Sequence, residues 1–301
     1  GSDLQSVKVN AQQDENGQWR ISGVKRFITN GCGDVLLVMA RSEPEITDGR
    51  GLSLFLVEKG PEVQVRRLEN KLGIHGSPTC ELLFDNAPGR LIGERQQGLI
   101  KYVMALMYGA RMGIAAQACG IGEAACRVAR QYAHDRKQFG TEIETFPAVR
   151  ELLVDNSLDL HAARALTYFS SACVDRQYGA MRALERDDIA DEAARKKAQA
   201  DAPKYKNQNR QPTPQSKYDA PEKCMRVAMN SISVMGGNGY MHDYPLERLL
   251  RDSRITTIYE GTTQLQIVAA VGGVTSGIAE TVVLELLDRE WPTDIAMMVE
   301  E

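Results

Sequence analysis

The sequence predicts an α+β protein in which a small antiparallel β-domain, barrel- or sandwich-like, precedes a helical bundle domain. Short apolar or alternating runs fill the first part of the chain, whereas after Gly98 apolar residues recur every three or four positions. A polar stretch then interrupts the helical pattern. We therefore divide the chain into residues 1–95, the β-domain, and residues 96–301, the helical domain, with a polar insertion at about 186–221.

The β-domain is predicted from brief runs that are separated by clusters of Gly, Pro and Asp. A turn signal from Asp14 to Gly17 leads into the nearly alternating residues Trp19, Ile21 and Val24. The later runs are VLLVMAR, LSLFLVEK, VQVRRL and CELLFDN. Many short strands with frequent turns are typical of a small barrel or sandwich.

The helical domain is predicted to begin with a long helix that ends near Arg136, because its apolar residues share one face. A second helix should start after Pro147, and a third should cover roughly Ala220 to Met235. In the polar insertion, the Ala/Glu/Lys-rich first half fits an exposed helix. The second half has too little apolar content to pack tightly, so we expect a mobile surface excursion there. The residues that share the face of the long helix are Leu99, Val103, Leu106, Ala110, Ile114 and Ala118.

The composition is that of an ordinary globular protein, since 43% of the 301 residues are hydrophobic and 25% are charged. A formal charge of -4 and the lack of a bilayer-length apolar run predict binding to neither nucleic acid nor membrane. The six cysteines lack the paired spacing of a metal site, so we expect reduced thiols, a cytoplasmic protein and no bound metal. The chain starts at Gly1 without methionine, which suggests an expression remnant or a missing upstream segment.

The stretch VMGGNGYMHDYP places Gly236, Gly237 and Gly239 directly after a predicted helix. Glycines at such a position either stop the helix or allow backbone N–H groups to approach phosphate oxygens. No strand is predicted before them, so they do not match a dinucleotide-binding fingerprint.

Two further stretches combine residues that could bind a ligand with residues that only shape the backbone. In HDRKQFG, Arg136 and Lys137 either stabilise the carboxyl terminus of the long helix or hold a phosphate or carboxylate. In GVKRFITNG, a turn explains Asn30-Gly31, and Phe27 and Thr29 lie just before it.

Glu260 follows the apolar, β-branched run from Ile255 to Tyr259 and precedes Gly-Thr-Thr-Gln. As a structural residue, it would place negative charge at the N-terminus of a helix that starts at Thr262 and Thr263. As a general base, it would use the desolvated position that the apolar run offers. The residues alone leave both interpretations open.

Taken together and in this order, these stretches resemble the acyl-CoA dehydrogenase family of flavoproteins. RKQFG, GGNGY followed by YPLERLLRD, and IYEGTTQLQ resemble its carboxyl-terminal motifs. GSDLQS and GVKRFITNG resemble motifs of its β-domain, and the similarity runs from Gly1 to about Val274.

The resemblance implies an amino-terminal helical domain, a middle β-domain and a carboxyl-terminal four-helix bundle, in a homodimer or homotetramer. The chain begins inside the motif that opens the β-domain, so the amino-terminal domain is expected to be absent from it. The resemblance also implies FAD as cofactor, an acyl-CoA as substrate and an electron-transferring flavoprotein as partner.

By position, the resemblance implies that Glu260 removes a proton from the α-carbon of the acyl thioester while a hydride leaves the β-carbon for flavin N5. Ala110 stands where some members carry a second candidate carboxylate, which leaves Glu260 as the base. The implied substrate contacts are Ser77, Arg111, Tyr259 and Gly261.

The resemblance also implies which residues hold FAD. Phe27 and Thr29 match positions beside the isoalloxazine, and Ser2 matches one beside the flavin phosphates. Thr262 and Gln264 match positions that reach the cofactor. The adenosine diphosphate half of the FAD bound by the neighbouring subunit would be received by Arg136, Phe139, Gly236 and Gly237.

The implied reaction is α,β-dehydrogenation of an acyl-CoA to the trans-2-enoyl-CoA, as in fatty acid β-oxidation. Two alternatives are an acyl-CoA oxidase, which passes electrons to oxygen, and a non-enzymatic relative that acts in assembly. The sequence does not define the acyl group, because part of the pocket lining would belong to the absent domain.

Overall fold

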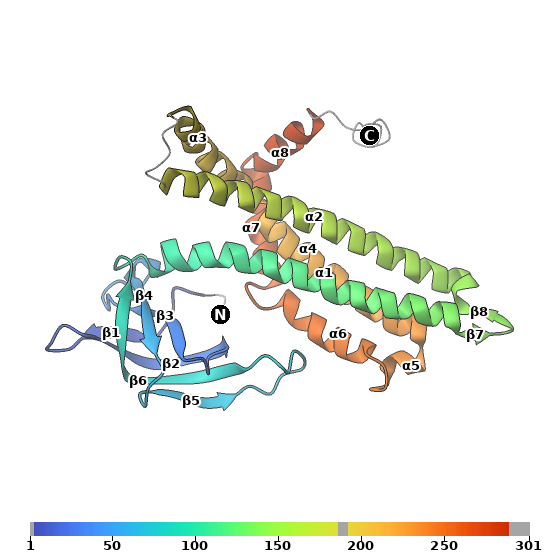
Figure 1. Ribbon diagram of the computed structural model, residues 1–301, viewed down its shortest axis with the longest axis horizontal. Helices are drawn as coiled ribbons and strands as arrows, with labels where there is room; N and C mark the ends of the chain where they lie inside the picture. Colours follow the sequence, from blue (N-terminus) through green and yellow to red (C-terminus); the bar gives the residue numbers. More distant parts are fainter. Residues whose placement is uncertain (1–2, 186–191, 289–301) are drawn as a thin grey trace. The chain divides into compact units, whose positions relative to one another are not determined.

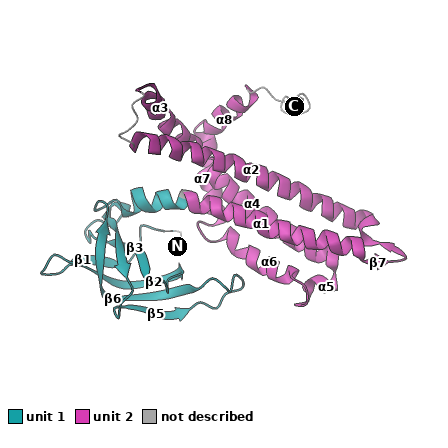
Figure 2. Ribbon diagram, viewed as in Figure 1, with its two compact units in different colours: residues 1–108 teal, residues 109–301 magenta. Residues whose placement is uncertain are grey.

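The computed structural model describes residues 3–185 and 192–288, and the chain divides into two compact units (Figure 2). Unit 1 comprises Gly1–Tyr108 and unit 2 comprises Gly109–Glu301. Unit 1 is a β-barrel and unit 2 is helical, which confirms the predicted α+β fold class. The division falls at Tyr108, inside the first long helix, whereas the sequence places it at residue 95.

Six strands form the barrel of unit 1 (Figure 1). They run in the order β2-β1-β3-β4-β6-β5, and an additional pairing of β2 with β6 closes the sheet on itself. The predicted runs VLLVMAR and VQVRRL coincide with β3 and β5. The strands are β1 (Asn10–Gln13), β2 (Trp19–Thr29), β3 (Val35–Arg41), β4 (Leu52–Glu58), β5 (Val63–Leu68) and β6 (Thr79–Ile92).

The barrel core is built from alternate residues of these strands, as the period of two requires. Ile21 of β2, Phe55 and Val57 of β4, and Leu82 and Phe84 of β6 are all buried. The pairing is antiparallel except at one point, because β1 meets β3 in parallel where Asn10 lies opposite Arg41. The domain is otherwise antiparallel, as predicted.

Long helices dominate unit 2 (Figure 1), and the first of them begins in unit 1. The first long helix ends at Asp135, close to the predicted end near Arg136, although it begins at Met104 rather than directly after Gly98. The second begins at Pro147, as predicted. A short hairpin of β7 (Lys137–Gln138) and β8 (Thr141–Glu142) joins them. The helices are α1 (Met104–Asp135), α2 (Pro147–Glu185), α3 (Glu192–Gln208), α4 (Pro212–Met235), α5 (Gly237–Tyr240), α6 (Leu246–Arg254), α7 (Thr263–Thr275) and α8 (Ile278–Leu287).

Small residues allow α1, α2 and α4 to approach closely. Ala115 and Ala118 of α1 share one cluster with Ala163 of α2 and with Ala220 and Cys224 of α4. The helical stretch Gly98–Asp135 is long and apolar enough to cross a membrane by length and composition, but core helices of helical bundles pass the same test. The predicted absence of membrane binding stays a prediction.

The structure corrects the expectation for the second half of the polar insertion. Helix α4 begins at Pro212 rather than near Ala220, and Thr213, Ser216 and Lys217 are buried. Hydrogen bonds within the helical core support this start, because Ser216 donates to the carbonyl of Thr213 at 3.0 Å and Ser170 of α2 donates to the carbonyl of Pro212 at 2.8 Å. The first half forms the exposed helix α3, as predicted, except that residues 186–191 lie outside the described residues.

Candidate active site

Glu260 lies on a tight turn between the 3-10 helix Ile255–Thr257 and helix α7. Its φ is 56° and that of Gly261 is 99°, so two successive residues adopt the left-handed region. This conformation is unfavourable for glutamate and natural for glycine. A Cβ at position 261 would lie 2.1 Å from Nε2 of Gln266, so no larger residue fits there without a shift. The turn therefore exposes a carboxylate on a constrained backbone.

Two buried side chains bind the carbonyl groups of this turn. Gln266 of α7 donates from Nε2 to the carbonyl of Glu260 at 3.4 Å. Lys217 of α4 donates from Nζ to the carbonyl of Gly261. Both side chains are only 1% exposed, so neither contact competes with bulk water.

Tyr259 and Arg111 lie in the same neighbourhood as Glu260. The hydroxyl of Tyr259 donates to Oε1 of Gln117 on α1. Burial, with a smaller effect of the Glu260 charge, raises the pKa of Tyr259 to about 12, so the phenol stays protonated. Burial, together with the charge of Arg111 and against the opposing charge of Glu260, lowers the pKa of Lys217 to about 8. These interactions bring the predicted residues Arg111, Tyr259, Glu260 and Gly261 together within unit 2.

Helix α7 starts directly after the turn, with Thr262 at its N-cap. The hydroxyl of Thr262 makes no capping hydrogen bond, so capping does not explain this residue. Thr263 instead donates to Oε1 of Glu222 on α4 at 2.5 Å. Gln264 is exposed and Thr262 is half-buried, so both side chains are accessible to a ligand from outside the helical core.

A second group of predicted residues lies at the other end of α4. Arg136 and Phe139 belong to the hairpin after α1, where Phe139 has a φ of 51° and is 95% exposed. Gly236 ends α4 and Gly237 follows it, and no atom of the described residues occupies the space that a Cβ would fill at either glycine. Figure 1 shows β7, β8 and α5 at the same end of the helical unit.

This second group is well separated from Glu260 in a single chain. Lys217, which contacts the Glu260 turn, and Gly236 stand roughly five turns apart on α4, which corresponds to about 30 Å along the helix axis. Within unit 2, the predicted base and the predicted adenosine diphosphate contacts therefore do not form one pocket.

The predicted residues of unit 1 lie where β2 ends and β6 begins. Phe27 has a φ of 61° and is 66% exposed, with the guanidinium of Arg26 4.8 Å from its ring centroid. Thr29 is exposed and pairs with Thr79 of β6. Ser77 precedes that strand, and its carbonyl accepts a hydrogen bond from Lys71. Ser2 lies outside the described residues.

The chemistry of these residues fits a flavin dinucleotide. An exposed aromatic ring beside a hydroxyl in unit 1 suits a planar conjugated ring with polar edges. In unit 2, Arg136 is exposed and forms no ion pair with any described residue, so its guanidinium is available to a phosphate. The open backbone at Gly236 and Gly237 would admit the dinucleotide closely.

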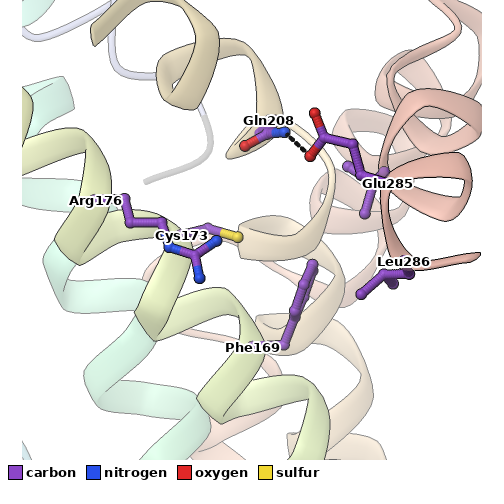
Figure 3. Close-up of a pocket in the computed structure, with 7 residues that line it drawn as sticks. Phe169, Cys173, Arg176, Gln208, Glu285 and Leu286 are labelled. Carbon is purple, nitrogen blue, oxygen red and sulfur yellow. Dashed lines mark hydrogen bonds between the residues drawn. The ribbon is translucent and has the colours of Figure 1, made fainter. Parts of the chain in front are cut away.

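The cavity drawn in Figure 3 is not a substrate site. It lies between α2, the end of α3 and α8, and its volume of about 10 Å³ has room for a single water molecule. Gln208 donates from Nε2 to Oε2 of Glu285 beside it at 2.7 Å. Its lining residues include Phe169, Cys173, Arg176 and Leu286, and none of the predicted site residues is among them.

Both units match models of one protein family. Residues 97–271 match the model for the acyl-CoA dehydrogenase C-terminal domain, and residues 1–87 match the model for the middle domain. A barrel unit followed by a helical unit thus corresponds to the middle and C-terminal domains of this class of proteins. The chain belongs to the acyl-CoA dehydrogenase family.

Individual relatives agree with this assignment. A probable acyl-CoA dehydrogenase, fadE25 of Mycobacterium bovis, is 37% identical over 88% of this chain and 62% of its own length. The structure of butyryl-CoA dehydrogenase from Megasphaera elsdenii is similar with a TM-score of 0.76 and 30% identity, over 91% of this chain and 65% of that one. A chain in a structure described as the electron transferring flavoprotein of Acidaminococcus fermentans gives the same four values. The chain thus spans less than two thirds of the length of these relatives.

Sequence reasoning missed the two residues that bind the turn carbonyls, Lys217 and Gln266. A signal for Lys217 was present, because Thr213, Lys217, Ala220 and Cys224 recur at helical spacing and are all buried. The third predicted helix could have been extended towards its amino terminus with the same spacing of buried residues. Lys217 would then have been placed on its buried face.

Proposed function

We propose that this protein catalyses flavin-dependent α,β-dehydrogenation of an acyl-CoA thioester, with Glu260 as the general base. The observation that carries this proposal is the left-handed turn at Glu260 and Gly261, which is bound to α4 and α7 in a chain of the acyl-CoA dehydrogenase family. A carboxylate held by its backbone keeps one direction, as proton abstraction from carbon requires.

In the proposed reaction, the Glu260 carboxylate accepts the proton from the α-carbon of the thioester. The flavin, when bound, supplies the acceptor for the hydride that leaves the β-carbon. Negative charge develops on the thioester as the α-proton leaves, and the cations of Arg111 and Lys217 near Glu260 favour it. The product is the trans-2-enoyl-CoA, and Glu260 ends the step protonated.

The proposed cofactor is FAD, held by residues of two subunits. Phe27, Thr29, Thr262 and Gln264 would contact the flavin half, and Arg136, Phe139, Gly236 and Gly237 the adenosine diphosphate half from the neighbouring chain. Lys217, beside the Glu260 turn, and Gly236 are separated by about 30 Å along α4, which supports the assignment of the two halves of FAD to two subunits. We therefore propose a homodimer or a homotetramer built from such dimers.

The proposed electron acceptor is an electron-transferring flavoprotein. The similarity to a chain in the Acidaminococcus fermentans structure supports this choice over oxygen. We also propose a cytoplasmic location, because none of the six cysteines forms a disulfide bond.

The test is an anaerobic titration of the purified flavoprotein with butyryl-CoA and longer acyl-CoA esters. We expect some of the esters to bleach the flavin absorption band. Re-oxidation by an electron-transferring flavoprotein, without steady peroxide formation in air, would support the proposed acceptor. A flavin band that no ester bleaches would contradict the proposed reaction, and rapid peroxide formation would favour an oxidase.

A further inference from the structure

Lys217 is among the largest fully buried side chains of the protein, with 1% of its surface exposed. Lysine is almost never buried in this way unless its charge has a partner. Among the described residues, Lys217 forms no ion pair, and its ammonium instead donates to the carbonyl of Gly261. A charge-assisted hydrogen bond of this kind is about twice as strong as a neutral one.

The position of this lysine is costly for the folded state. Burial lowers its pKa to about 8, and the nearby charge of Arg111 on α1 acts in the same direction, while Glu260 and Glu222 oppose it. An apolar side chain of similar size at a buried charged position is often neutral or stabilising. A residue that reduces stability beside the candidate base suggests a role in function rather than in folding.

The contact fixes the peptide group between Gly261 and Thr262, which lies between the base and the start of helix α7. The carbonyl of Glu260 is bound by Gln266 at a long distance of 3.4 Å, whereas that of Gly261 is bound by the ammonium of Lys217. Since Glu260 itself has a φ of 56°, the left-handed turn depends on such external contacts. Without Lys217, the carbonyl of Gly261 would lose its partner and the turn could rotate.

We propose that Lys217 is a positioning residue, whose hydrogen bond to the carbonyl of Gly261 holds the Glu260 turn in the conformation required for proton abstraction. This inference rests on the proposed function in so far as Glu260 is the base. We call the hydrogen bond between Lys217 of α4 and the carbonyl of Gly261 the clamp. Its presence can be tested without turnover.

The first measurement is hydrogen–deuterium exchange of the flavin-loaded protein, for wild type, Lys217→Met and Lys223→Met. Lys223 lies on the same helix and pairs with Asp219, so its variant is a matched control without contact to the turn. We expect exchange in residues 255–266 to be on the order of tenfold faster in Lys217→Met alone. Exchange in this segment equal to that of wild type would overturn the clamp.

The second measurement is the rate of anaerobic flavin reduction by the best acyl-CoA ester in the same variants. Lys217→Met should reduce flavin on the order of tenfold more slowly, with the affinity for the ester almost unchanged. Lys217→Gln keeps a donor on a side chain one bond shorter, and it should recover part of the rate. Faster exchange in the turn with a wild-type rate would show that the clamp does not serve Glu260.

The melting temperature distinguishes the positioning role of Lys217 from a merely structural role. Lys217→Met should melt no lower than Lys223→Met, because it removes a buried charge. A lower melting temperature with faster exchange throughout α4 would overturn the positioning role. If wild type shows no reduction with any ester, the proposed function fails, whereas the exchange measurement still decides the clamp.

Discussion

Asn238 donates a hydrogen bond from Nδ2 to the hydroxyl of Tyr132 at 2.8 Å, which ties the turn after α4 to the last part of α1. Arg136 follows Tyr132 by one helical turn, and its backbone N–H donates to the carbonyl of Tyr132 at 2.9 Å. Arg136 and the open glycines Gly236 and Gly237 thus share one end of unit 2. This end has the composition expected of a surface for a dinucleotide phosphate.

We predict that Arg136→Ala weakens FAD retention, because the variant loses a guanidinium that is not engaged by any described carboxylate. One lost bidentate phosphate contact corresponds to about 2 kcal/mol, or roughly thirtyfold in affinity. The flavin-to-protein absorbance ratio after gel filtration measures this loss. The control is Arg127→Ala, since Arg127 is an exposed cation of α1, the helix that ends just before Arg136, and it pairs with Glu123. Equal flavin occupancy in both variants would argue against the shared site.

We predict that Glu260→Gln binds FAD normally but is reduced by acyl-CoA about 10² to 10⁴ times more slowly than wild type. The amide keeps the size of the side chain and cannot accept the α-proton as a carboxylate does. Stopped-flow bleaching of the flavin band measures the rate, and Glu280→Gln on the exposed face of α8 serves as the control. Near-wild-type reduction in Glu260→Gln would rule out Glu260 as the base.

The strands and the first two long helices could be read from the sequence because their burial follows a simple period. In β4 the buried Phe55 and Val57 alternate with less buried neighbours, and α1 carries alanines at helical spacing on its buried face. The start of α4 could not be read in this way. Its buried residues there are Thr213, Ser216 and Lys217, and the burial of Lys217 depends on a hydrogen bond to the distant carbonyl of Gly261.

The candidate site shows the same limit. The residues Glu260, Arg136 and Gly236 were predicted from a resemblance of motifs, because motifs carry the groups that would touch ligands. The φ of 56° at Glu260 and its contacts to Gln266 are tertiary features that no local pattern records. Glycine at position 261 was the one local sign of a left-handed turn.

We predict that Gly261→Ala destabilises the protein by about 1 to 3 kcal/mol and lowers flavin reduction along with stability. Gly261 has a φ of 99°, and an added Cβ would meet Nε2 of Gln266 at 2.1 Å. Urea denaturation measures the free energy of unfolding. The matched control is Gly272→Ala in α7, where a Cβ meets no described atom within 4 Å and should stabilise the helix by about 0.5 to 1 kcal/mol. Equal stabilities of the two variants would contradict the strained turn.

We predict that the stability of wild type relative to Lys217→Met increases as the pH rises from about 8 to about 10.5. The folded-state pKa of Lys217 is about 8, against an ordinary value of 10.5, because burial disfavours the ammonium. Below about pH 8 the lysine is charged in both states, so the burial cost is fully present. Between the two values the unfolded state binds more protons, so the free energy of unfolding rises with pH.

The measurement is urea denaturation of both proteins at pH values from about 7 to about 10, so that titrations common to both cancel. The groups that face the ammonium are Arg111, Glu260 and Glu222, and all three are unchanged in the variant. Lys223→Met, which removes a partly buried lysine of the same helix, is measured alongside as a control. The difference in the free energy of unfolding between wild type and Lys217→Met could instead be constant over this range. The lysine would then titrate in the folded protein as it does in the unfolded chain. This result would contradict the conclusion that the charged ammonium of Lys217 is buried against the carbonyl of Gly261.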